Sequence, residues 1–523
     1  MEELDVIVIG AGLSGICALH TLSSTSSQIP LSFVALESRP EIGGTWSFFK
    51  YPGFRNDSSM FTFGFGFNPW RQTKHIVEGS QIKKYLNETV DKFDLRKHIK
   101  TNVCVTKCDF SKKTGKWTVT TKDKTYIASY IISATGYYDY SKPHFPAYDG
   151  TLDFTSNGGT IMHAQFWDDD LSLKNKTVSI IGSGATAITI LPMLVAQGVK
   201  VNLIQRSPTY IVPMPSTEDN LFSKLILKYF GEYGFTIFRY FHLWIGYFFF
   251  WYCTWFPMMA RISIKTTAFF SLQVSSGDFR KNYNRHFTPK YNPWQQRLCL
   301  SPDNDFYSSV VKPNCSVHTG IINRFNSKGV ELADGSTVDT DVLVYATGLT
   351  LLPLGGIKLT VDGKETKPAD TVMYKSYHPS SIPNLFVLTG YLNSSWTLRV
   401  ELTMDYVGRI LRKMRKQKYD LCYPVFKEKD RVADLLGFNS GYIVRGGGLM
   451  PQQGKGSPWV MWQNYARDWW EMTMGSLDDG VMKFERIARK EAVEKRMNYA
   501  EKRAEKGMGN LKRRPKQKMS IFE

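Results

Sequence analysis

Two glycine-rich turns, each between a buried strand and a helix, constrain the fold of this chain more than any other feature. In the first, the apolar run 5–9 leads into Gly10-Ala-Gly12-Leu-Ser14-Gly15, and the helical run 16–22 follows. Glycines at this spacing let the backbone approach a pyrophosphate, and the next helix supplies free N–H groups at its N-terminus. The segment predicts a dinucleotide-binding fold in which the cofactor is bound by Gly10, Gly12, Ser14 and Gly15.

The end of the next strand predicts which dinucleotide this first fold binds. The apolar strand 31–36 ends in Glu37. A carboxylate at this position accepts hydrogen bonds from both ribose hydroxyls of an adenosine, and it repels a 2′-phosphate. Glu37 therefore favours FAD or NAD over NADP in the first fold.

A second strand–turn–helix segment repeats the pattern with the opposite charge. The strand 177–181 is followed by Gly182-Ser183-Gly184-Ala185-Thr186-Ala187, and the strand 199–204 leads to Arg206-Ser207. Arg206 can bind a 2′-phosphate, although it could also be a solvated charge at a strand end. The two folds predict two cofactors, FAD in the first and NADPH in the second. The expected fold class is α/β, with two Rossmann-like dinucleotide-binding domains and a helical insertion.

Loops that follow Glu37 add candidates for cofactor contact. Two glycines beside Trp46 allow a loop to lie flat against a ligand, and a Pro-Gly turn at 52–53 carries an Arg and an Asp two positions apart. The Arg and Asp could face a cofactor ring or form a surface ion pair. The residues predicted here to bind the cofactor are Gly44, Thr45, Trp46, Arg55, Asn56, Asp57 and Val105.

The order of these segments predicts an interrupted domain layout. The strand 383–390 and the amphipathic helix 399–415 would return the chain to the first sheet, and 483–506 alternates Glu with Lys or Arg at helical spacing. The expected units are the first part of the FAD-binding domain at 1–143, a linker at 144–170, the NADP-binding domain at 171–350 with an apolar helical insertion at about 215–290, the second part of the FAD-binding domain at 351–482, and a charged helix with a basic tail at 483–523.

The insertion contains an unusual apolar block. Residues 240–260 include no Asp, Glu, Lys or Arg, and Arg239 and Arg261 flank them. The length allows a membrane span, but a single span would place Arg206 and the later site residues on opposite sides of the membrane. Two alternatives remain, an element that lies in a membrane interface and a buried helical subdomain that lines a substrate tunnel. The basic tail could bind anionic lipid or only increase solubility.

Charge and cysteine usage exclude several classes of function. The net charge is +19, but no nucleic-acid-binding module is visible, so nucleic acid is not an expected partner. Seven dispersed cysteines indicate reduced thiols and complete no zinc site, so no metal is expected. The acidic N-terminus lacks the layout of a signal peptide. We expect a protein that is not secreted and lies on the cytoplasmic side, in possible peripheral contact with a membrane. The oligomeric state is not determined by the sequence.

Taken together, these motifs resemble the class B flavoprotein monooxygenases, which include Baeyer–Villiger and flavin-containing monooxygenases. The stretch 159–168 is similar to the Baeyer–Villiger fingerprint from its glycine onward, although Asn157 stands where the family usually has Phe. Segments 55–57, 205–212, 291–300 and 390–398 are most similar to the ethionamide-activating mycobacterial type. The resemblance assigns the interdomain fingerprint to Gly159, His163, Trp167 and Asp168.

The resemblance also implies a reaction. FAD reduced by NADPH would react with O₂, and one oxygen atom would pass to a small hydrophobic ketone to give an ester or lactone, or to a thioether. Arg297 would stabilise the flavin peroxide and the retained NADP⁺, and Asp57 would orient Arg297. His163 would influence how the NADP domain moves over the flavin. Spacing alone does not rank Arg297 above Arg280 or Arg285.

Three other functions are compatible with parts of this pattern. The first is a flavin-containing monooxygenase that mainly oxygenates sulfur or nitrogen in soft nucleophiles, and Trp167-Asp168 favours Baeyer–Villiger chemistry over it. The second, a disulfide reductase, needs two closely spaced cysteines beside the flavin, and Cys17 is alone there. The third, a non-catalytic membrane-anchored protein, is disfavoured by the intact glycine loops and by Arg297.

Overall fold

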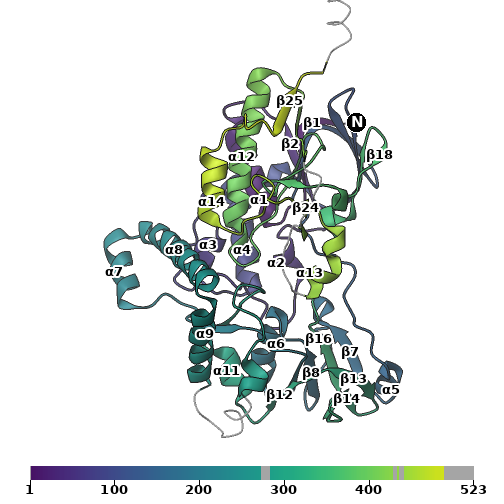
Figure 1. Cartoon of the computed structure of the whole chain (residues 1–523), viewed down its shortest axis with the longest axis vertical. Helices are drawn as coiled ribbons and strands as arrows, with labels where there is room; N and C mark the ends of the chain where they lie inside the picture. Colours follow the sequence, from purple (N-terminus) through teal and green to yellow (C-terminus); the bar gives the residue numbers. More distant parts are fainter. Residues whose placement is uncertain (1, 273–282, 428–432, 435–440, 488–523) are drawn as a thin grey trace, which may run out of the picture.

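The first glycine loop joins an inner strand of a nine-stranded sheet to the helix that follows it (Figure 1). The computed structural model describes residues 2–272, 283–427, 433–434 and 441–487. Strand β1 pairs in parallel with β2 on one side and β6 on the other, so the loop after β1 lies at the carboxyl edge of the sheet. The elements are β1 (Glu2–Ile9), α1 (Leu13–Ser26), β2 (Phe33–Leu36), β3 (Ile99–Lys100), β4 (Val105–Ser111), β5 (Lys116–Thr121) and β6 (Thr125–Ser133).

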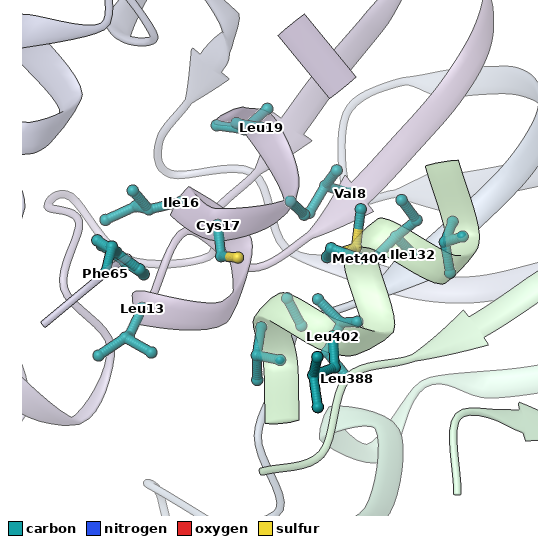
Figure 2. Packing of buried hydrophobic residues seen from close by; sticks show 14 of the residues in the cluster. Val8, Leu13, Ile16, Cys17, Leu19, Phe65, Ile132, Leu388, Leu402 and Met404 are labelled. Carbon is teal, nitrogen blue, oxygen red and sulfur yellow. The ribbon is translucent and has the colours of Figure 1, made fainter. Parts of the chain in front are cut away.

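Late segments of the chain complete this first sheet, as the sequence predicts. Strand β17 pairs with β4, β18 pairs with β17, and β21 pairs with β6. Helix α12 packs on α1, and Figure 2 shows Cys17 of α1 facing Leu402 and Met404 of α12 across the core. The elements are β17 (Lys358–Val361), β18 (Lys364–Glu365), β21 (Leu385–Val387) and α12 (Trp396–Gln417).

The second glycine loop belongs to a separate sheet of five parallel strands, in the order β12-β9-β8-β16-β7. Its elements are β7 (Thr160–His163), β8 (Thr177–Ile181), α6 (Ala185–Ala196), β9 (Lys200–Gln205), β12 (Cys315–Thr319) and β16 (Val342–Tyr345). The assignment of 144–170 to a linker is therefore wrong at 160–163. These residues are the edge strand of the second sheet, because they pair in parallel with β16.

The insertion interrupts the second domain between two short paired strands, β10 (Ile211–Met214) and β11 (Cys299–Pro302). It contains α7 (Leu221–Phe230), α8 (Tyr233–Trp255) and α9 (Pro257–Ser271), and in Figure 1 α7 and α8 project from the side of the molecule. The apolar block is thus divided between two helices at Phe256–Pro257. Among the described residues, no helix is long and apolar enough to cross a membrane.

The charged C-terminal segment begins differently from its prediction. Residues 482–485 form β25 (Met482–Glu485), which pairs antiparallel with β22 (Leu421–Pro424). The helix expected from 483 is therefore wrong over its first residues, because Met482 is buried against the first core. The remainder of that predicted helix and the basic tail, 488–523, lie outside the described residues.

Smaller elements cover the two sheets and connect them. The helices are α2 (Thr45–Phe48), α3 (Met60–Phe63), α4 (Gly79–Lys92), α5 (Thr151–Ser156), α11 (Asp305–Val310), α13 (Gly441–Gly446) and α14 (Tyr465–Trp469). The strands are β13 (Ile322–Asn326), β14 (Gly329–Leu332), β15 (Thr337–Asp339), β19 (Met373–Tyr374), β20 (His378–Pro379), β23 (Ala433–Asp434) and β24 (Gln452–Gln453).

Candidate active site

A cavity of about 680 Å³ lies where the first glycine loop meets the N-terminal ends of α6 and α12. Every residue that the sequence predicts for the FAD side lines this cavity except Gly15. From the second domain, Ala185, Thr186 and Arg297 reach its wall. The FAD-side residues on the wall are Gly10, Gly12, Ser14, Glu37, Gly44, Thr45, Trp46, Arg55, Asn56, Asp57 and Val105.

The first glycine loop is shaped by close backbone contacts that exclude side chains. A Cβ on Gly15 would lie 2.0 Å from the carbonyl oxygen of Gly10, and one on Gly12 would lie 3.3 Å from Gly44 Cα. Gly10 has a φ of +101°, which L side chains rarely adopt. The loop therefore presents bare backbone to the cavity, as a bound pyrophosphate requires. Gly15 serves by allowing α1 to pack against the loop.

The carboxylate of Glu37 is buried below the loop and is held by backbone donors. One oxygen accepts the N–H of Ala11 at 2.7 Å, and the other accepts the N–H of Arg39 at 3.0 Å. The Arg39 guanidinium donates to the carbonyl of Gly44 at 2.6 Å and lies 3.9 Å from the Glu37 carboxylate, so it links Glu37 to the loop that contains Gly44. Sequence reasoning missed Arg39, because nothing in its local sequence distinguishes it from a surface arginine.

Three of the predicted residues also make contacts that shape the cavity wall. Ser14 Oγ accepts the indole N–H of Trp396 at 2.8 Å, which ties α1 to the start of α12. Thr45 Oγ1 and the Tyr140 hydroxyl are 2.8 Å apart. The Asn56 amide holds neighbouring backbone, donating to the His75 carbonyl at 3.0 Å. Asn56 thus fixes the loop that carries Asp57 and has little free hydrogen-bonding capacity of its own.

An ion pair between Asp57 and Arg297 joins the two dinucleotide folds at the cavity. Arg297 Nη2 lies 2.7 Å from Asp57 Oδ1 and 2.6 Å from Oδ2. The side chain of Arg297 is 40% exposed, and it lines the cavity. Burial by itself would lower the pKa of Arg297, but Asp57 and then Tyr138 outweigh it and hold that pKa above its ordinary value. Arg297 is therefore a permanent cation on the wall.

The structure ranks the three candidate arginines that spacing leaves equal. Arg285 pairs with Asp334 at 3.1 Å and donates to the carbonyl of Thr319, away from the cavity. Arg280 lies outside the described residues. Arg297 is thus the one of the three that the structure places on the cavity wall.

Arg55 makes the second ion pair between the folds. Its Nη1 lies 2.5 Å from Asp305 Oδ2 on α11, whereas its Nη2 is buried with no hydrogen-bond partner among the described residues. A buried guanidinium donor without a partner is costly, so Nη2 is available to a ligand in the cavity. Nearby, the Tyr51 hydroxyl bonds Thr186, and burial raises the pKa of Tyr51 to about 12. Tyr51 is therefore a neutral hydrogen-bonding group at neutral pH.

The second glycine loop has the same backbone contact as the first but a more open setting. A Cβ on Gly182 would lie 2.4 Å from the carbonyl of Ala346, whereas one on Gly184 would meet nothing within 4 Å. Ser183 Oγ donates to the carbonyl of Ser207 at 2.8 Å. The predicted residues of this loop that do not line the cavity are Gly182, Ser183, Gly184, Ala187, Arg206 and Ser207.

Arg206 is exposed at the end of β9, and a second arginine lies within its electrostatic reach. Burial, and then the charge of Arg206, lower the pKa of Arg445 at the end of α13. Two guanidinium groups held near each other suit a dianionic ligand such as a 2′-phosphate. Sequence reasoning missed Arg445, which lies 239 positions after Arg206 in a segment with no motif.

The fingerprint residues are placed at separate points around β7. His163 is buried and lines the cavity, its Nδ1 accepts the N–H of Gln165 at 3.0 Å, and burial lowers its pKa to about 4. A Cβ on Gly159 would overlap the Phe154 ring at 2.5 Å. Trp167 packs against the core of the second sheet, and exposed Asp168 accepts the N–H of Asp170. Only His163 of the four reaches the cavity.

One further cluster lies beside α8. His75, Glu218 and His242 bring potential metal-ligand atoms within 4.8 Å of one another, and His242 Nε2 lies 3.0 Å from Glu218 Oε1. The sequence predicts no metal site, because these three residues come from distant segments with no ligand spacing. Their hydrogen bond fastens α8 to the segment that enters the insertion. All seven cysteines are free thiols, and Cys17 is buried.

The chain is similar along nearly its whole length to known monooxygenases. It is 37% identical to "Probable FAD-binding monooxygenase AlmA" of Acinetobacter baylyi over 93% of this chain and 97% of that protein. It is 35% identical to the FAD-containing monooxygenase EthA of Mycolicibacterium smegmatis, over 92% of this chain and 97% of that one. The chain belongs to the class B flavin monooxygenases. The prediction of an FAD- and NADP-dependent flavoprotein monooxygenase of the Baeyer–Villiger type is confirmed at the level of this family.

The fold is also that of solved members of this family. The open crystal structure of cyclohexanone monooxygenase matches with a TM-score of 0.66 and 21% identity, over 81% of this chain and 90% of that one. The OTEMO complex with FAD and NADP matches with a TM-score of 0.64 and 21% identity, over 81% and 88%. The family model for pyridine nucleotide-disulphide oxidoreductases matches residues 7–218. The predicted α/β fold with two Rossmann-like sheets is therefore confirmed.

Proposed function

We propose that this chain catalyses the Baeyer–Villiger oxidation of hydrophobic ketones, inserting one oxygen atom of O₂ beside the carbonyl to give an ester or lactone. The Arg297–Asp57 ion pair on the cavity wall supports this proposal most directly. A fixed cation stabilises negative charge on a nucleophilic oxygen, which then attacks an electrophilic carbonyl. The aromatic side chains of Trp46 and Phe54 on the wall favour an apolar substrate. Thioethers are proposed as further substrates.

We also propose how the chain holds its two cofactors. FAD lies along the first glycine loop with its adenosine ribose on Glu37, and NADPH lies along the second loop with its 2′-phosphate on Arg206. When both are bound, the flavin reduced by NADPH supplies the activation of O₂. The proposed FAD domain combines 1–143 with 351–482, and the proposed NADP domain combines 171–350 with the edge strand 160–163. Asp57 is a positioning residue that holds Arg297 from the opposite domain.

The reaction is tested by product analysis with a ketone and a thioether of matched chain length, supplied separately with NADPH and air. We expect the ketone to yield an ester as the preferred product. If the protein forms sulfoxide from the thioether while it oxidises NADPH, but forms no ester from the ketone, the result would instead support the flavin-containing monooxygenase alternative.

The role of Arg297 is tested by Arg297→Ala. We expect flavin reduction by NADPH to persist under anaerobic conditions, while ester formation falls by about 10²–10³-fold, because the cation that stabilises developing negative charge is lost. Arg285→Ala is the matched control, since it removes an arginine of the same segment that pairs with Asp334 away from the cavity. Ester formation by Arg297→Ala at the wild-type rate would contradict this assignment.

We further propose that the chain works at the surface of a membrane, on its cytoplasmic side, in contact through residues 240–260. The exposed aromatic side chains of Trp244, Phe248 and Trp251 support this contact. A membrane is also where apolar ketones and thioethers dissolve, so the contact and the proposed substrates agree.

A further inference from the structure

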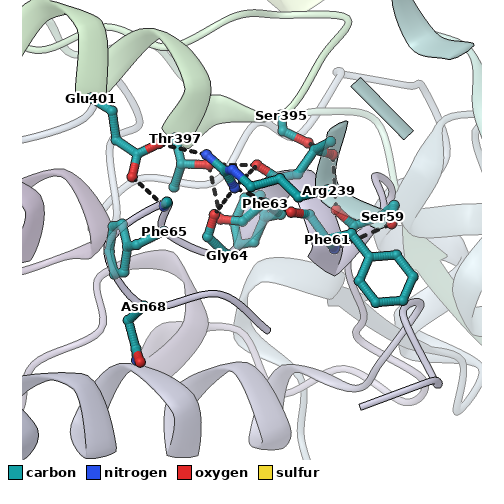
Figure 3. Close-up of polar contacts among 12 residues, drawn as sticks. Ser59, Phe61, Phe63, Gly64, Phe65, Asn68, Arg239, Ser395, Thr397 and Glu401 are labelled. Carbon is teal, nitrogen blue, oxygen red and sulfur yellow. Dashed lines mark hydrogen bonds and ion pairs between the residues drawn. The ribbon is translucent and has the colours of Figure 1, made fainter. Parts of the chain in front are cut away.

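Helix α8 has one face fixed to the body of the protein by buried polar contacts. The buried Arg239 guanidinium donates to the carbonyl of Gly64 at 2.5 Å and pairs with Glu401 of α12 at 2.7 Å. Figure 3 shows this arginine reaching into the loop around Gly64, with Glu401 at its other side. The bond between His242 and Glu218 adds a second attachment one turn later. The helix is therefore held in one orientation, and its outward face is determined by the fold.

That outward face is apolar over most of the insertion. Of the 28 large hydrophobic side chains exposed in the described part of the chain, 18 lie between 221 and 271. On α8, exposed aromatic residues follow the helical repeat and form a single stripe of Tyr240, Trp244, Phe248, Trp251 and Trp255. Contiguous apolar surface of this kind marks an interaction site rather than ordinary surface.

The charges around this surface indicate which partner it fits. Apart from the buried Arg239, the basic residues between 221 and 271 are Lys224, Lys228, Arg261 and Lys265, and the single acidic residue is Glu232. Exposed Lys224 and Lys228 lie on α7 beside the apolar face. Lys224 pairs with Asp219 at 2.8 Å, and the Lys228 ammonium lies over the Tyr229 ring. Tryptophan, tyrosine and lysine together, with almost no carboxylates, match the interface of an anionic bilayer.

The same helix also contacts the segment that carries Arg297. The rings of Phe249 and Phe250 contact the Trp294 ring at centroid distances of 6.0 and 5.2 Å. Trp294 lies three residues before Arg297, and its carbonyl accepts the amide of Asn393 from the loop before α12. Its φ of +76° is unusual for a residue with a side chain, so the surrounding contacts hold this tryptophan in place. Phe249, Phe250 and Trp294 thus join α8 to the short segment whose Arg297 lines the cavity.

We infer that α7, α8 and α9 dock on an anionic lipid bilayer, and that apolar substrate enters the cavity from the bilayer beside Trp294. The docked surface lies in the interface, since no described helix is long and apolar enough to span. Docking on the bilayer is inferred from the exposed residues of the insertion alone. Entry of substrate from the bilayer rests in addition on the proposed oxidation of hydrophobic ketones. A ketone taken up this way passes from lipid to the cavity without crossing water.

Docking is tested by flotation of the FAD-loaded full-length protein with vesicles of phosphatidylcholine, with and without phosphatidylglycerol. The variant Trp244→Gln/Phe248→Gln/Trp251→Gln changes three exposed side chains and leaves the anchored face of α8 intact. We expect the wild type to float with the anionic vesicles and the variant to bind them at least about tenfold less, because interfacial burial of three aromatic groups is lost. The control is Leu152→Gln/Ile321→Gln/Trp470→Gln, which alters exposed hydrophobic residues elsewhere and should bind like the wild type.

Equal vesicle binding by the α8 variant and the wild type, or no binding by the wild type, would overturn docking. Wild-type self-association that the α8 variant abolishes, without vesicle binding, would also overturn it and would identify a second copy of the chain as the occupant. The melting temperature and FAD content of each variant establish that it is folded.

Entry is tested with two ketones, a long-chain ketone dissolved in the anionic vesicles and a short ketone dissolved in water. We expect the α8 variant to lose at least about tenfold in kcat/KM for the vesicle-borne ketone, in proportion to its lost binding, and to oxidise the short ketone like the wild type. Equal oxidation of the vesicle-borne ketone by both proteins would overturn the entry route. Failure of the wild type on both ketones, with vesicle binding intact, would reject the proposed reaction and leave docking standing.

Discussion

The two glycine loops share one backbone design but differ in how the chain surrounds them. In both, the first glycine packs against the carbonyl of an Ala-Thr-Gly turn, at Ala134 for Gly10 and at Ala346 for Gly182. Around the first loop, Glu37 is buried and its two oxygens are held by backbone N–H groups. Around the second loop, Arg206 is exposed, and a Cβ on Gly184 would meet open space.

This difference suits two cofactors with different residence times. A resident flavin is served by a site that is enclosed and built before the cofactor binds, because little conformational entropy is then lost on binding. A nicotinamide cofactor that arrives reduced and leaves oxidised in each cycle needs an open approach and charges near solvent. The sequence distinguishes the loops by Glu37 and Arg206, and the structure adds the contrast between enclosed and open surroundings.

The largest effect is expected from the position where the two loops differ by one methyl group. Gly15 in the first loop corresponds to Ala187 in the second, and a Cβ on Gly15 would lie 2.0 Å from the carbonyl oxygen of Gly10. We expect Gly15→Ala to lower the free energy of unfolding by about 3 kcal/mol and to abolish FAD retention, because backbone must move. Bound flavin per chain and denaturant unfolding measure both effects. The reverse change, Ala187→Gly, should cost only about 1 kcal/mol and leave FAD bound. Full flavin occupancy in Gly15→Ala would show that the close contact at Gly15 is not required for flavin binding.

A smaller effect, confined to NADPH, is expected from Arg206→Ala. Loss of a charge-assisted contact to the 2′-phosphate should raise the KM for NADPH by about 10- to 100-fold, equivalent to about 1.4–2.7 kcal/mol. FAD content should be unchanged, because Arg206 lies outside the cavity that the first loop lines. NADH provides the internal control, since it lacks the 2′-phosphate and its KM should change little. An equal rise in KM for both cofactors would show that Arg206 does not read that phosphate.

The two glycine loops, the strands before them and the helices after them could be predicted from the sequence, because each strand, turn and helix is encoded within a few adjacent residues. The ion pair between Asp57 and Arg297 could be expected only from the resemblance to a family, since 240 positions separate the two side chains. Arg445 had no signal at all, because its approach to Arg206 depends on how the third part of the chain returns across both domains. Contacts of this kind are properties of topology, which local periodicity does not encode.

Two local predictions failed for a related reason. Residues 160–163 form an edge strand, although their surroundings are polar and rich in glycine, because β16 offers a free parallel edge. Residues 482–485 form a strand, although their charges also fit a helix, because they pair with β22. In both cases a partner strand distant in sequence decided the structure, and short segments have too little intrinsic preference to resist such pairing.

The smallest effect is expected at Gly184, which tests whether the openness of the second loop is a property of the free protein. A Cβ there meets nothing within 4 Å, whereas one on Gly12 would lie 3.3 Å from Gly44 Cα. We expect Gly184→Ala to lower stability by no more than about 1 kcal/mol, because alanine is a poorer N-cap than glycine. FAD content should be unaltered, since no protein atom must move. The added methyl group would still stand where backbone approaches the pyrophosphate, so the KM for NADPH should rise severalfold. Gly12→Ala should instead reduce flavin binding, because two loops must separate to admit it. If Gly184→Ala lost flavin as readily as Gly12→Ala, the two loops would not be the independent sites that their surroundings indicate. The Asp57–Arg297 ion pair, which joins the two domains, would then be the contact that couples them.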